Sequence, residues 1–197
     1  MSAAPTLHRR EVVKTLLAQR GDALVVAGLG STAWDCTAAG DSALTFPLWG
    51  AMGAAAMVGL GLAIAQPARR VLVITGDGEM LMGLGSLATI GVQAPRNLAI
   101  AVIDNERYGE TGMQATHTAH GVDLAAVALG CRFASARMVR DSGELDAARA
   151  SLLAGDGPVL VQFKVLAEKV ALVLPPHDGV ALKERFRRAL LGATAAK

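Results

Sequence analysis

Short segments that are apolar throughout alternate along the chain with segments whose apolar residues recur every three or four positions. The first kind predicts buried strands and the second predicts helices with one buried face. The strands are expected at 23–27, 71–75, 98–104 and 158–165, with a further short one at 132–135. The helices are expected at 11–19, 48–65, 79–91, 123–129, 142–153 and 181–191. Wholly apolar strands separated by helices indicate a parallel sheet that is covered on both faces. We therefore expect an α/β fold with three α/β/α layers and a mostly parallel sheet. No repeat or low-complexity linker divides the chain, so residues 1–197 are expected to form a single domain.

Residues 48–65 form an uncharged segment of eighteen residues, which is at the threshold length for crossing a bilayer. The segment consists mostly of Ala and Gly, which contribute little to lipid transfer, and strand and helix patterns flank it. It therefore predicts a helix buried against the sheet and no membrane contact. Residues 1–10 contain no apolar run, so we expect no signal peptide and a cytoplasmic protein.

The composition excludes several other classes of protein. Apolar residues make up 52% of the chain and charged residues 18%, which is typical of a globular domain. The net charge of +2 comes from interspersed acids and bases, so no nucleic-acid partner is expected. Arg185, Arg187 and Arg188 predict a solvated face on the last helix. Cys36 and Cys131 match no metal or redox spacing.

Ligands of parallel α/β sheets bind beyond the carboxyl ends of the strands, so the residues that follow each strand are informative. Gly28, Gly30 and Ala33 follow the first strand and match a dinucleotide-binding fingerprint, which is a weak signal alone. The next residues, 32–42, resemble a loop rather than the helix that the fingerprint requires. A tight strand exit is the better interpretation, and a dinucleotide-binding oxidoreductase domain remains an alternative.

The ends of the next two strands carry polar side chains that suit a hard metal ion. Asp77 lies between two glycines after the strand at 71–75, and Asn105 follows the strand at 98–104. If these strands are neighbours, the two side chains offer oxygen atoms to one point, which Mg²⁺ prefers together with phosphate and water. The backbone amides of Gly78 and Glu79, at the start of a helix, suit a phosphate. Taken singly, Asp77 is better interpreted as a helix cap and Asn105 as a turn residue. The pair, placed after successive strands, favours a metal site.

The segment GDG, followed after twenty-five residues by Asp104 and Asn105, resembles the GDG…NN signature of thiamine diphosphate enzymes. Asp104 stands where the signature has its first Asn. Residues 79–114 resemble the corresponding stretch of sulfopyruvate and phosphonopyruvate decarboxylases, and 48–53 resembles their G-x-M-G element. The similarity covers about 25–128 and identifies the C-terminal, diphosphate-binding domain of this family, most like the β subunit of sulfopyruvate decarboxylase.

The resemblance implies thiamine diphosphate and Mg²⁺ as cofactors. It implies that Mg²⁺ is bound by the side chains of Asp77 and Asn105 and by the backbone oxygen of Arg107. It implies that Gly50 and Met52 contact the cofactor rings, with Met52 supporting a bent conformation. The remaining cofactor-binding residues that it implies are Gly76, Asp77, Gly78, Glu79, Asn105, Tyr108, Gly109 and Glu110. A carboxylate beside two phosphates is unfavourable, so the Glu79 side chain is expected to point away from them.

The resemblance also implies an incomplete active site. In this family an activating Glu lies on a second, pyrimidine-binding domain, for which the chain has no room. It is therefore expected on an α subunit, giving an α2β2 or higher hetero-oligomer whose interface includes the apolar surface beside Met52. The implied activity is decarboxylation of a small 2-oxo acid. His117 and His120 follow the metal loop and are candidates on the substrate side, with ordinary surface histidines as the better interpretation. An acetolactate synthase-like ligase and a non-catalytic cofactor-binding subunit remain alternatives.

Overall fold

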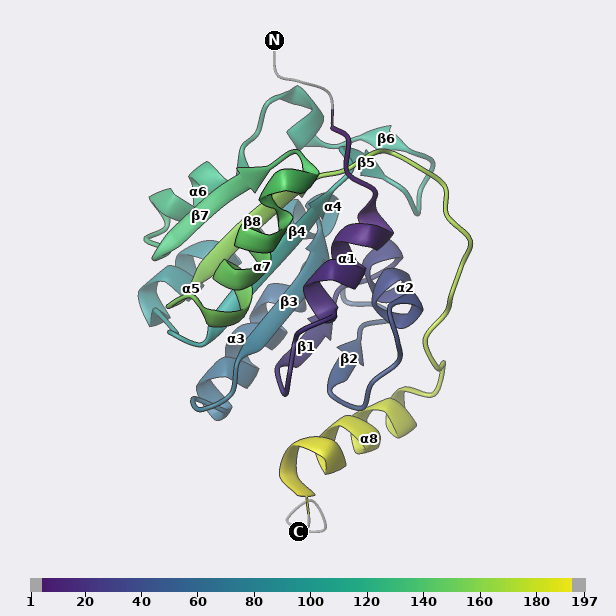
Figure 1. The fold of residues 1–197 in the computed structure, drawn as a ribbon, viewed down its shortest axis with the longest axis vertical. Helices are drawn as coiled ribbons and strands as arrows, with labels where there is room; N and C mark the ends of the chain where they lie inside the picture. Colours follow the sequence, from purple (N-terminus) through teal and green to yellow (C-terminus); the bar gives the residue numbers. More distant parts are fainter. Residues whose placement is uncertain (1–4, 193–197) are drawn as a thin grey trace.

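The computed structural model describes residues 5–192 and has a parallel sheet at its centre (Figure 1). Its strands are β1 (Leu24–Ala27), β2 (Thr45–Pro47), β3 (Val71–Gly76), β4 (Leu98–Asp104), β7 (Ser135–Val139) and β8 (Val159–Lys164). They pair in parallel in the order β2-β1-β3-β4-β8-β7. Two two-residue strands, β5 (Arg107–Tyr108) and β6 (Gln114–Ala115), form a separate antiparallel pair after β4.

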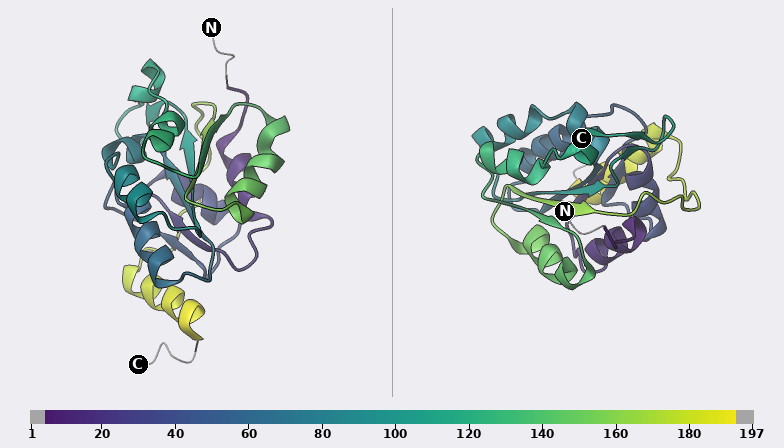
Figure 2. Two further views of the ribbon diagram at one scale, coloured as in Figure 1. Left: turned by 90° about the vertical axis from the view of Figure 1, so that its left-hand side faces the viewer. Right: turned by 90° about the horizontal axis from the view of Figure 1, so that it is seen from above.

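Helices cover both faces of this sheet, as the view from above shows (Figure 2). One face carries α1 (Arg9–Leu17), α2 (Ser31–Ala38) and α7 (Leu145–Ala154). The other carries α3 (Ala55–Ala65), α4 (Asp77–Met82), α5 (Ser86–Gln93) and α6 (Leu124–Gly130). Alternate residues of β1 enter opposite cores, with Val25 on the first face and Val26 on the second. The expected three-layer α/β/α fold is confirmed.

The last helix, α8 (Gly179–Leu191), packs at the β2 edge of the sheet after a long extended segment (Figure 1). The rings of Phe46 and Phe186 lie 5.5 Å apart, centroid to centroid. Arg185 donates two hydrogen bonds to Asp41, of 2.6 and 2.9 Å. On the arginine face of α8, the partly exposed Arg185 side chain therefore fastens the helix to the loop before β2.

The expectation of a loop at 32–42 is wrong, because α2 occupies most of that range. The sequence of α2 is a poor helix former, and tertiary contacts stabilise it instead. Asp35 is fully buried and accepts hydrogen bonds from Arg9 at 2.6 Å and from Arg10 at 3.0 Å, which tie α2 to α1. The Thr37 hydroxyl donates to the Ala33 carbonyl one turn earlier.

Two of the expected helices are shorter than predicted because of backbone turns. The helix expected over 48–65 begins only at Ala55, since Ala51 and Gly53 have φ values of 57° and 91°. The helix expected over 79–91 is divided into α4 and α5 near Gly83, where an added Cβ would lie 2.1 Å from the Gly53 carbonyl oxygen. The close approach of these two turns holds the loop 48–54 against the end of α4.

Smaller differences concern the remaining elements. Strand β7 begins three residues later than the strand expected at 132–135, and the short edge strand β2 was not predicted. The helix expected at 142–153 begins with a 3₁₀ turn, η2 (Ser142–Glu144), that leads into α7. Another 3₁₀ turn, η1 (His117–His120), follows β6. Within residues 5–192 there is no helix long and apolar enough to cross a membrane.

Candidate functional site

The two strand ends that carry the expected metal ligands are neighbours. Strands β3 and β4 pair directly, with Gly76 opposite Ile103, so Asp77 and Asn105 leave the sheet side by side at its carboxyl edge. The prediction of a shared metal site depended on these two strands being neighbours, and they are. Asp77 begins α4, and Asn105 begins the turn that leads into β5.

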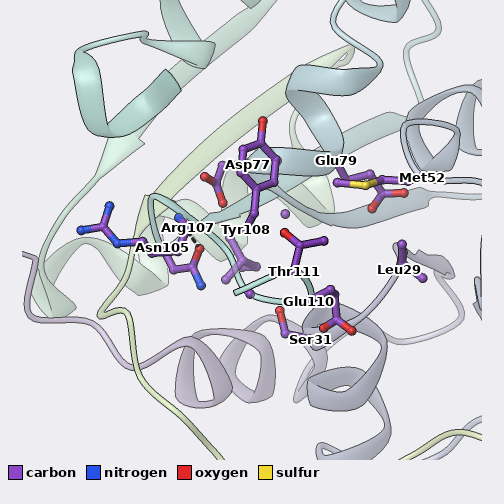
Figure 3. Close-up of a pocket in the computed structure, with 14 residues that line it drawn as sticks. Leu29, Ser31, Met52, Asp77, Glu79, Asn105, Arg107, Tyr108, Glu110 and Thr111 are labelled. Carbon is purple, nitrogen blue, oxygen red and sulfur yellow. Dashed lines mark hydrogen bonds between the residues drawn. The ribbon is translucent and has the colours of Figure 1, made fainter. Parts of the chain in front are cut away.

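A cavity of about 200 Å³ lies at this edge, between the turn after β1, the start of α4 and the loop after β4 (Figure 3). Asp77, Asn105 and Arg107 lie at one end of it, and Glu79 and Met52 lie at the other (Figure 3). The cavity is lined by Leu29, Ser31, Met52, Gly76, Asp77, Gly78, Glu79, Ile103, Asn105, Arg107, Tyr108, Gly109, Glu110 and Thr111. These include all of the expected cofactor-binding and metal-binding residues except Gly50.

Several lining residues were missed at the sequence level. Leu29 and Ser31 belong to the glycine-rich turn after β1, which lies at the same carboxyl edge as Asp77. Because ligands bind beyond the carboxyl ends of parallel strands, the position of these two residues after β1 could have predicted them. Thr111 lies in the loop between β5 and β6, and no signal in the sequence points to it. Gly50 is exposed and does not line the cavity.

Asp77 is a buried carboxylate with neutral hydrogen-bond donors. Its side chain accepts hydrogen bonds through Oδ2 from the Thr116 hydroxyl at 2.6 Å and from the Thr118 hydroxyl at 3.3 Å. Burial raises the pKa of Asp77 to about 7, and the nearby negative charge of Asp104 contributes in the same direction. No basic side chain within residues 5–192 forms an ion pair with Asp77, so this group is well suited to a cation.

Asp104, in contrast, forms its hydrogen bonds with groups inside the protein. Its side chain is fully buried, and it accepts four hydrogen bonds. Oδ1 accepts from the Thr118 hydroxyl at 2.7 Å and from the Glu106 amide at 3.0 Å. Oδ2 accepts from Gln162 Nε2 at 2.6 Å and from Lys164 Nζ at 2.9 Å. With both oxygen atoms occupied, Asp104 is not free to bind a metal in the cavity. Within residues 5–192, the half-buried Asn105 side chain accepts a single hydrogen bond, from the Arg107 amide at 3.0 Å.

Glu79 lines the cavity, but its carboxylate is held at the end of β1. Its Oε2 accepts a hydrogen bond of 2.7 Å from the Thr75 hydroxyl. A Cβ at Gly28 would lie 1.9 Å from the same oxygen, so the carboxylate packs directly against that glycine. Burial raises the pKa of Glu79, while the Thr75 hydroxyl lowers it. The side chain therefore lies at the opposite end of the cavity from Asn105, as Figure 3 shows.

The glycine turn after β1 does not suit a dinucleotide. The helix that the fingerprint requires is present, since α2 begins at Ser31. However, a Cβ at Gly28 or Gly30 would contact a carboxylate oxygen of Glu79 or Glu110, at 1.9 and 2.8 Å. Two acidic side chains thus pack against these glycines, and their negative charge disfavours a pyrophosphate at this turn and with it the oxidoreductase alternative.

Neither candidate histidine lines the cavity. His117 and His120 lie in η1 and are exposed. Their neighbours Thr116 and Thr118 point inward and contact Asp77 instead. In the part of the chain that the structure describes, no group of three His, Cys, Asp or Glu residues could hold a metal ion. The donor set at Asp77 and Asn105 contains one carboxylate and otherwise depends on amide and backbone oxygens.

Comparisons with known proteins identify the family of this chain. Residues 29–163 match the family described as thiamine pyrophosphate enzyme, C-terminal TPP binding domain. The chain is 37% identical to the sulfopyruvate decarboxylase subunit beta of Methanothermobacter thermautotrophicus, over 95% of this chain and 98% of that protein. It is 42% identical to the phosphonopyruvate decarboxylase of Streptomyces viridochromogenes, over 94% of this chain but only 46% of that longer protein.

Solved structures support the same fold. The benzoylformate decarboxylase of Polynucleobacter necessarius superposes with a TM-score of 0.67 at 19% identity, over 84% of this chain and 34% of that one. At this identity the similarity concerns the fold alone. The family match, in contrast, spans more than half of the chain and includes both strand ends that form the cavity. The chain belongs to the thiamine pyrophosphate enzyme family and contains its C-terminal TPP binding domain.

Proposed function

We propose that the chain is the β-type subunit of a decarboxylase that uses thiamine diphosphate and Mg²⁺ to act on a small 2-oxo acid. The observation that carries this proposal is the placement of Asp77 and Asn105 at neighbouring strand ends that face one cavity. The similarity to a sulfopyruvate decarboxylase subunit beta over nearly the whole of both chains supports it. The names of the relatives favour a substrate with a sulfonate or phosphonate tail.

The residues at the cavity fit a magnesium ion that carries a diphosphate. Asp77 offers a carboxylate oxygen, Asn105 an amide oxygen and Arg107 a backbone carbonyl, all of which are hard donors. A Cβ at Gly78 would lie 2.6 Å from the Tyr108 ring and 3.7 Å from Met52 Cε, so only glycine leaves the backbone open here. We assign the amides of Gly78 and Glu79 to the diphosphate, together with the backbone of the loop at 108–110 and the carboxyl edge at Gly76.

The ring end of the cofactor is assigned to the loop at 48–54. Met52 lines the cavity and is 37% exposed, so it can contact a bound molecule on one side and a partner on the other. Gly50 lies on the same exposed loop and is assigned to the pyrimidine ring through its carbonyl. When bound, thiamine diphosphate supplies an electron sink for loss of CO₂ from the substrate, while the protein orients it and sets its electrostatic environment.

We propose that a partner α subunit supplies the pyrimidine-binding domain and the activating carboxylate. Large apolar side chains are exposed on the loop at 48–54, which carries the cavity residue Met52, and on α3 and α4. These are Trp49, Met52, Met57, Val58 and Met82. Exposed apolar groups of this kind mark protein interfaces, and the name subunit beta given to several relatives is consistent with a second chain. We propose an assembly of at least two αβ pairs, which is what the family resemblance implies.

Ligand-dependent thermal unfolding tests the proposal. A ligand at a hundred times its dissociation constant stabilises a protein by about 2.7 kcal/mol. For a chain of this size that corresponds to a rise in Tm of roughly 5–10 °C. We expect this rise with thiamine diphosphate plus Mg²⁺ and no rise with NAD. A rise with NAD alone would refute the assignment and favour an oxidoreductase.

The Asp77→Ala variant tests the metal site. It should remain folded and lose the Mg²⁺-dependent rise in Tm. Asp146→Ala is the matched control, because Asp146 is an exposed acid on α7. Retention of the full rise by Asp77→Ala would exclude Asp77 as a metal ligand. Release of CO₂ and an aldehyde after the chain is mixed with its α subunit would identify a decarboxylase, whereas condensation of two oxo acids would identify a ligase.

A further inference from the structure

A buried polar cluster lies directly beneath the two strand ends that form the metal site. It consists of Thr116, Thr118, Asp104, Gln162 and Lys164, each 4% exposed or less. The members come from β4, from β8 and from the segment at 116–118, and hydrogen bonds connect all of them. None of them lines the cavity, so they touch the site only through Asp77 and through the turn after β4.

We propose that Thr116, supported by the buried Asp104–Lys164 ion pair, is a positioning residue that fixes the two halves of the metal site relative to each other. It thereby makes the site selective for a small cation that requires strict octahedral geometry. This inference rests on the proposed function, since it concerns the site that Asp77, Asn105 and Arg107 form.

The first half of the site depends on the Thr116 side chain. Its hydroxyl donates to Oδ2 of Asp77 at 2.6 Å, and both residues are buried. Thr118 contacts the same oxygen at 3.3 Å. Within the described residues, no side chain donates to the other oxygen, Oδ1. The carboxylate is therefore held from one side, which leaves Oδ1 available to a ligand.

The second half depends on the Thr116 backbone. Its amide donates to the Glu106 carbonyl at 3.0 Å. Glu106 has a φ of 61°, a left-handed conformation that is unfavourable for a residue with a side chain and persists only when its surroundings impose it. This residue lies between Asn105 and Arg107. Its conformation therefore determines where the amide side chain and the backbone carbonyl of these two expected ligands point.

The Asp104–Lys164 ion pair holds the same turn from below. Asp104 accepts a hydrogen bond from the Glu106 amide at 3.0 Å, and Lys164 Nζ lies 2.5 Å from Oε1 of Glu106. Lys164 also pairs with Asp104 at 2.9 Å, and its side chain is only 4% exposed. Buried ion pairs contribute little net stability compared with apolar packing. A role in fixing the geometry of the adjacent turn accounts for this one.

A fixed spacing between Asp77 and the turn after β4 should make the site bind some cations more tightly than others. Mg²⁺ requires nearly ideal octahedral coordination at short distances, whereas Ca²⁺ accepts variable geometry and longer bonds. If Asp77 and the turn after β4 lose their fixed spacing, Mg²⁺ should lose more affinity than Ca²⁺. A residue that only stabilises the fold would instead lower the affinity for both ions equally.

The decisive variants are Thr116→Val, which removes the hydroxyl and retains the shape, and Thr116→Ser, which retains the hydroxyl. Thr37→Val is the matched control, because Thr37 donates a hydrogen bond within α2, away from the cavity. The measurements are Tm without ligand, and the apparent affinities for Mg²⁺ and for Ca²⁺ at a fixed, saturating concentration of thiamine diphosphate. We expect Thr116→Val to weaken Mg²⁺ binding by about tenfold, a typical loss when a group that orients a metal ligand is removed. Its Ca²⁺ affinity should change less than threefold, and Thr116→Ser should recover most of the Mg²⁺ affinity.

Glu106→Gln is an independent variant, because its side chain is 34% exposed and the substitution does not threaten the fold. It removes the ion pair with Lys164 and should also lower the ratio of Mg²⁺ to Ca²⁺ affinity. Equal losses for both ions, or no loss in either variant, would overturn the positioning role. If the parent chain, mixed with its α subunit, failed to bind thiamine diphosphate with any cation, the proposed function would be refuted instead.

Discussion

Helix α3 contains two glycines that differ only in what faces them. Gly59 is buried against the sheet, and an added Cβ there would lie 2.2 Å from Val73 Cγ2 and 3.4 Å from Leu98 Cδ1. Gly61 is exposed, and an added Cβ would meet nothing within 4 Å. Substitution of each by alanine makes the same chemical change in the same helix. The pair therefore isolates the close packing of α3 on β3.

The structure predicts opposite signs for the two substitutions. Alanine stabilises a helix interior relative to glycine by about 0.5–1 kcal/mol, so Gly61→Ala should raise Tm by roughly 1–4 °C for a chain of this size. At Gly59 the same gain is opposed by the contact with Val73, which is fully buried and must move by about 1 Å. Overpacking of this kind costs about 1–3 kcal/mol. Gly59→Ala should therefore lower the free energy of unfolding by about 0.5–2 kcal/mol and lower Tm.

Thermal and urea unfolding of the isolated chain, followed by far-UV circular dichroism, are sufficient to measure both effects. A rise in Tm for both variants would show that α3 does not approach β3 as closely as the structure has it. The consequence would extend to the site, because α3 begins directly after the loop that carries Met52. A larger distance between α3 and the sheet would displace that loop from the cavity.

Three further substitutions test separate regions. Gly78→Ala places a Cβ 2.6 Å from the Tyr108 ring, and the free energy of unfolding should stay within about 1 kcal/mol of the parent value. Calorimetric titration with thiamine diphosphate and Mg²⁺ should show at least about tenfold weaker binding. Unchanged affinity would contradict the assigned approach of the diphosphate. Asp41→Asn removes the carboxylate whose pKa is held below its usual range by hydrogen bonds from Arg185. The Arg185–Asp41 pair should make the parent chain more stable than this variant by about 0.2–1 kcal/mol at pH 7. This stability difference should vanish as the pH falls below about 4 and through the lowered pKa of the folded state, so a difference that persists at about pH 2 would refute the assigned role of the pair. Trp49→Ala removes a hydrogen bond of 2.8 Å and a stacked ring contact with the segment before α8; limited proteolysis should cleave that segment several-fold faster, and an unchanged rate would mean that other contacts hold it.

The central strands could be predicted because they are buried on both faces. Every residue of β1, β4 and β8 is buried, so apolar composition alone reveals these elements. The edge strand β2 has only three residues and ends in Pro47, which leaves no pattern to detect. Helix α2 was missed for a different reason. It depends on the pairing of Asp35 with two arginines of α1, and such long-range contacts are invisible to local periodicity.

The same distinction applies to the site. The ligands at Asp77 and Asn105 follow strands directly, and the parallel register places their strand ends together. Thr116 and Thr118 contact Asp77 from 39 and 41 residues further along the chain, after an irregular loop, and no spacing rule relates them to it. Lys164 belongs to a strand whose apolar pattern conceals its pairing with Asp104. Local sequence therefore indicates which residues face a ligand, whereas the residues that hold them become visible only in the folded chain.

The distribution of charge around β3 and β4 explains why a cation is expected at one acid and not at the other. Two buried carboxylates, Asp77 and Asp104, lie at neighbouring strand ends and repel each other. Among residues 5–192, the ion-pairing base near them is Lys164, and it pairs with Asp104. Among the described residues, the side chains that donate to Asp77 are hydroxyls, which stabilise a buried negative charge less than a cation does. A buried carboxylate that remains uncompensated is costly, so the fold retains Asp77 at the expense of stability. The cost is understandable if a divalent ion in the cavity neutralises this charge, because the ion then binds most strongly at the position that the protein leaves without a counter-charge.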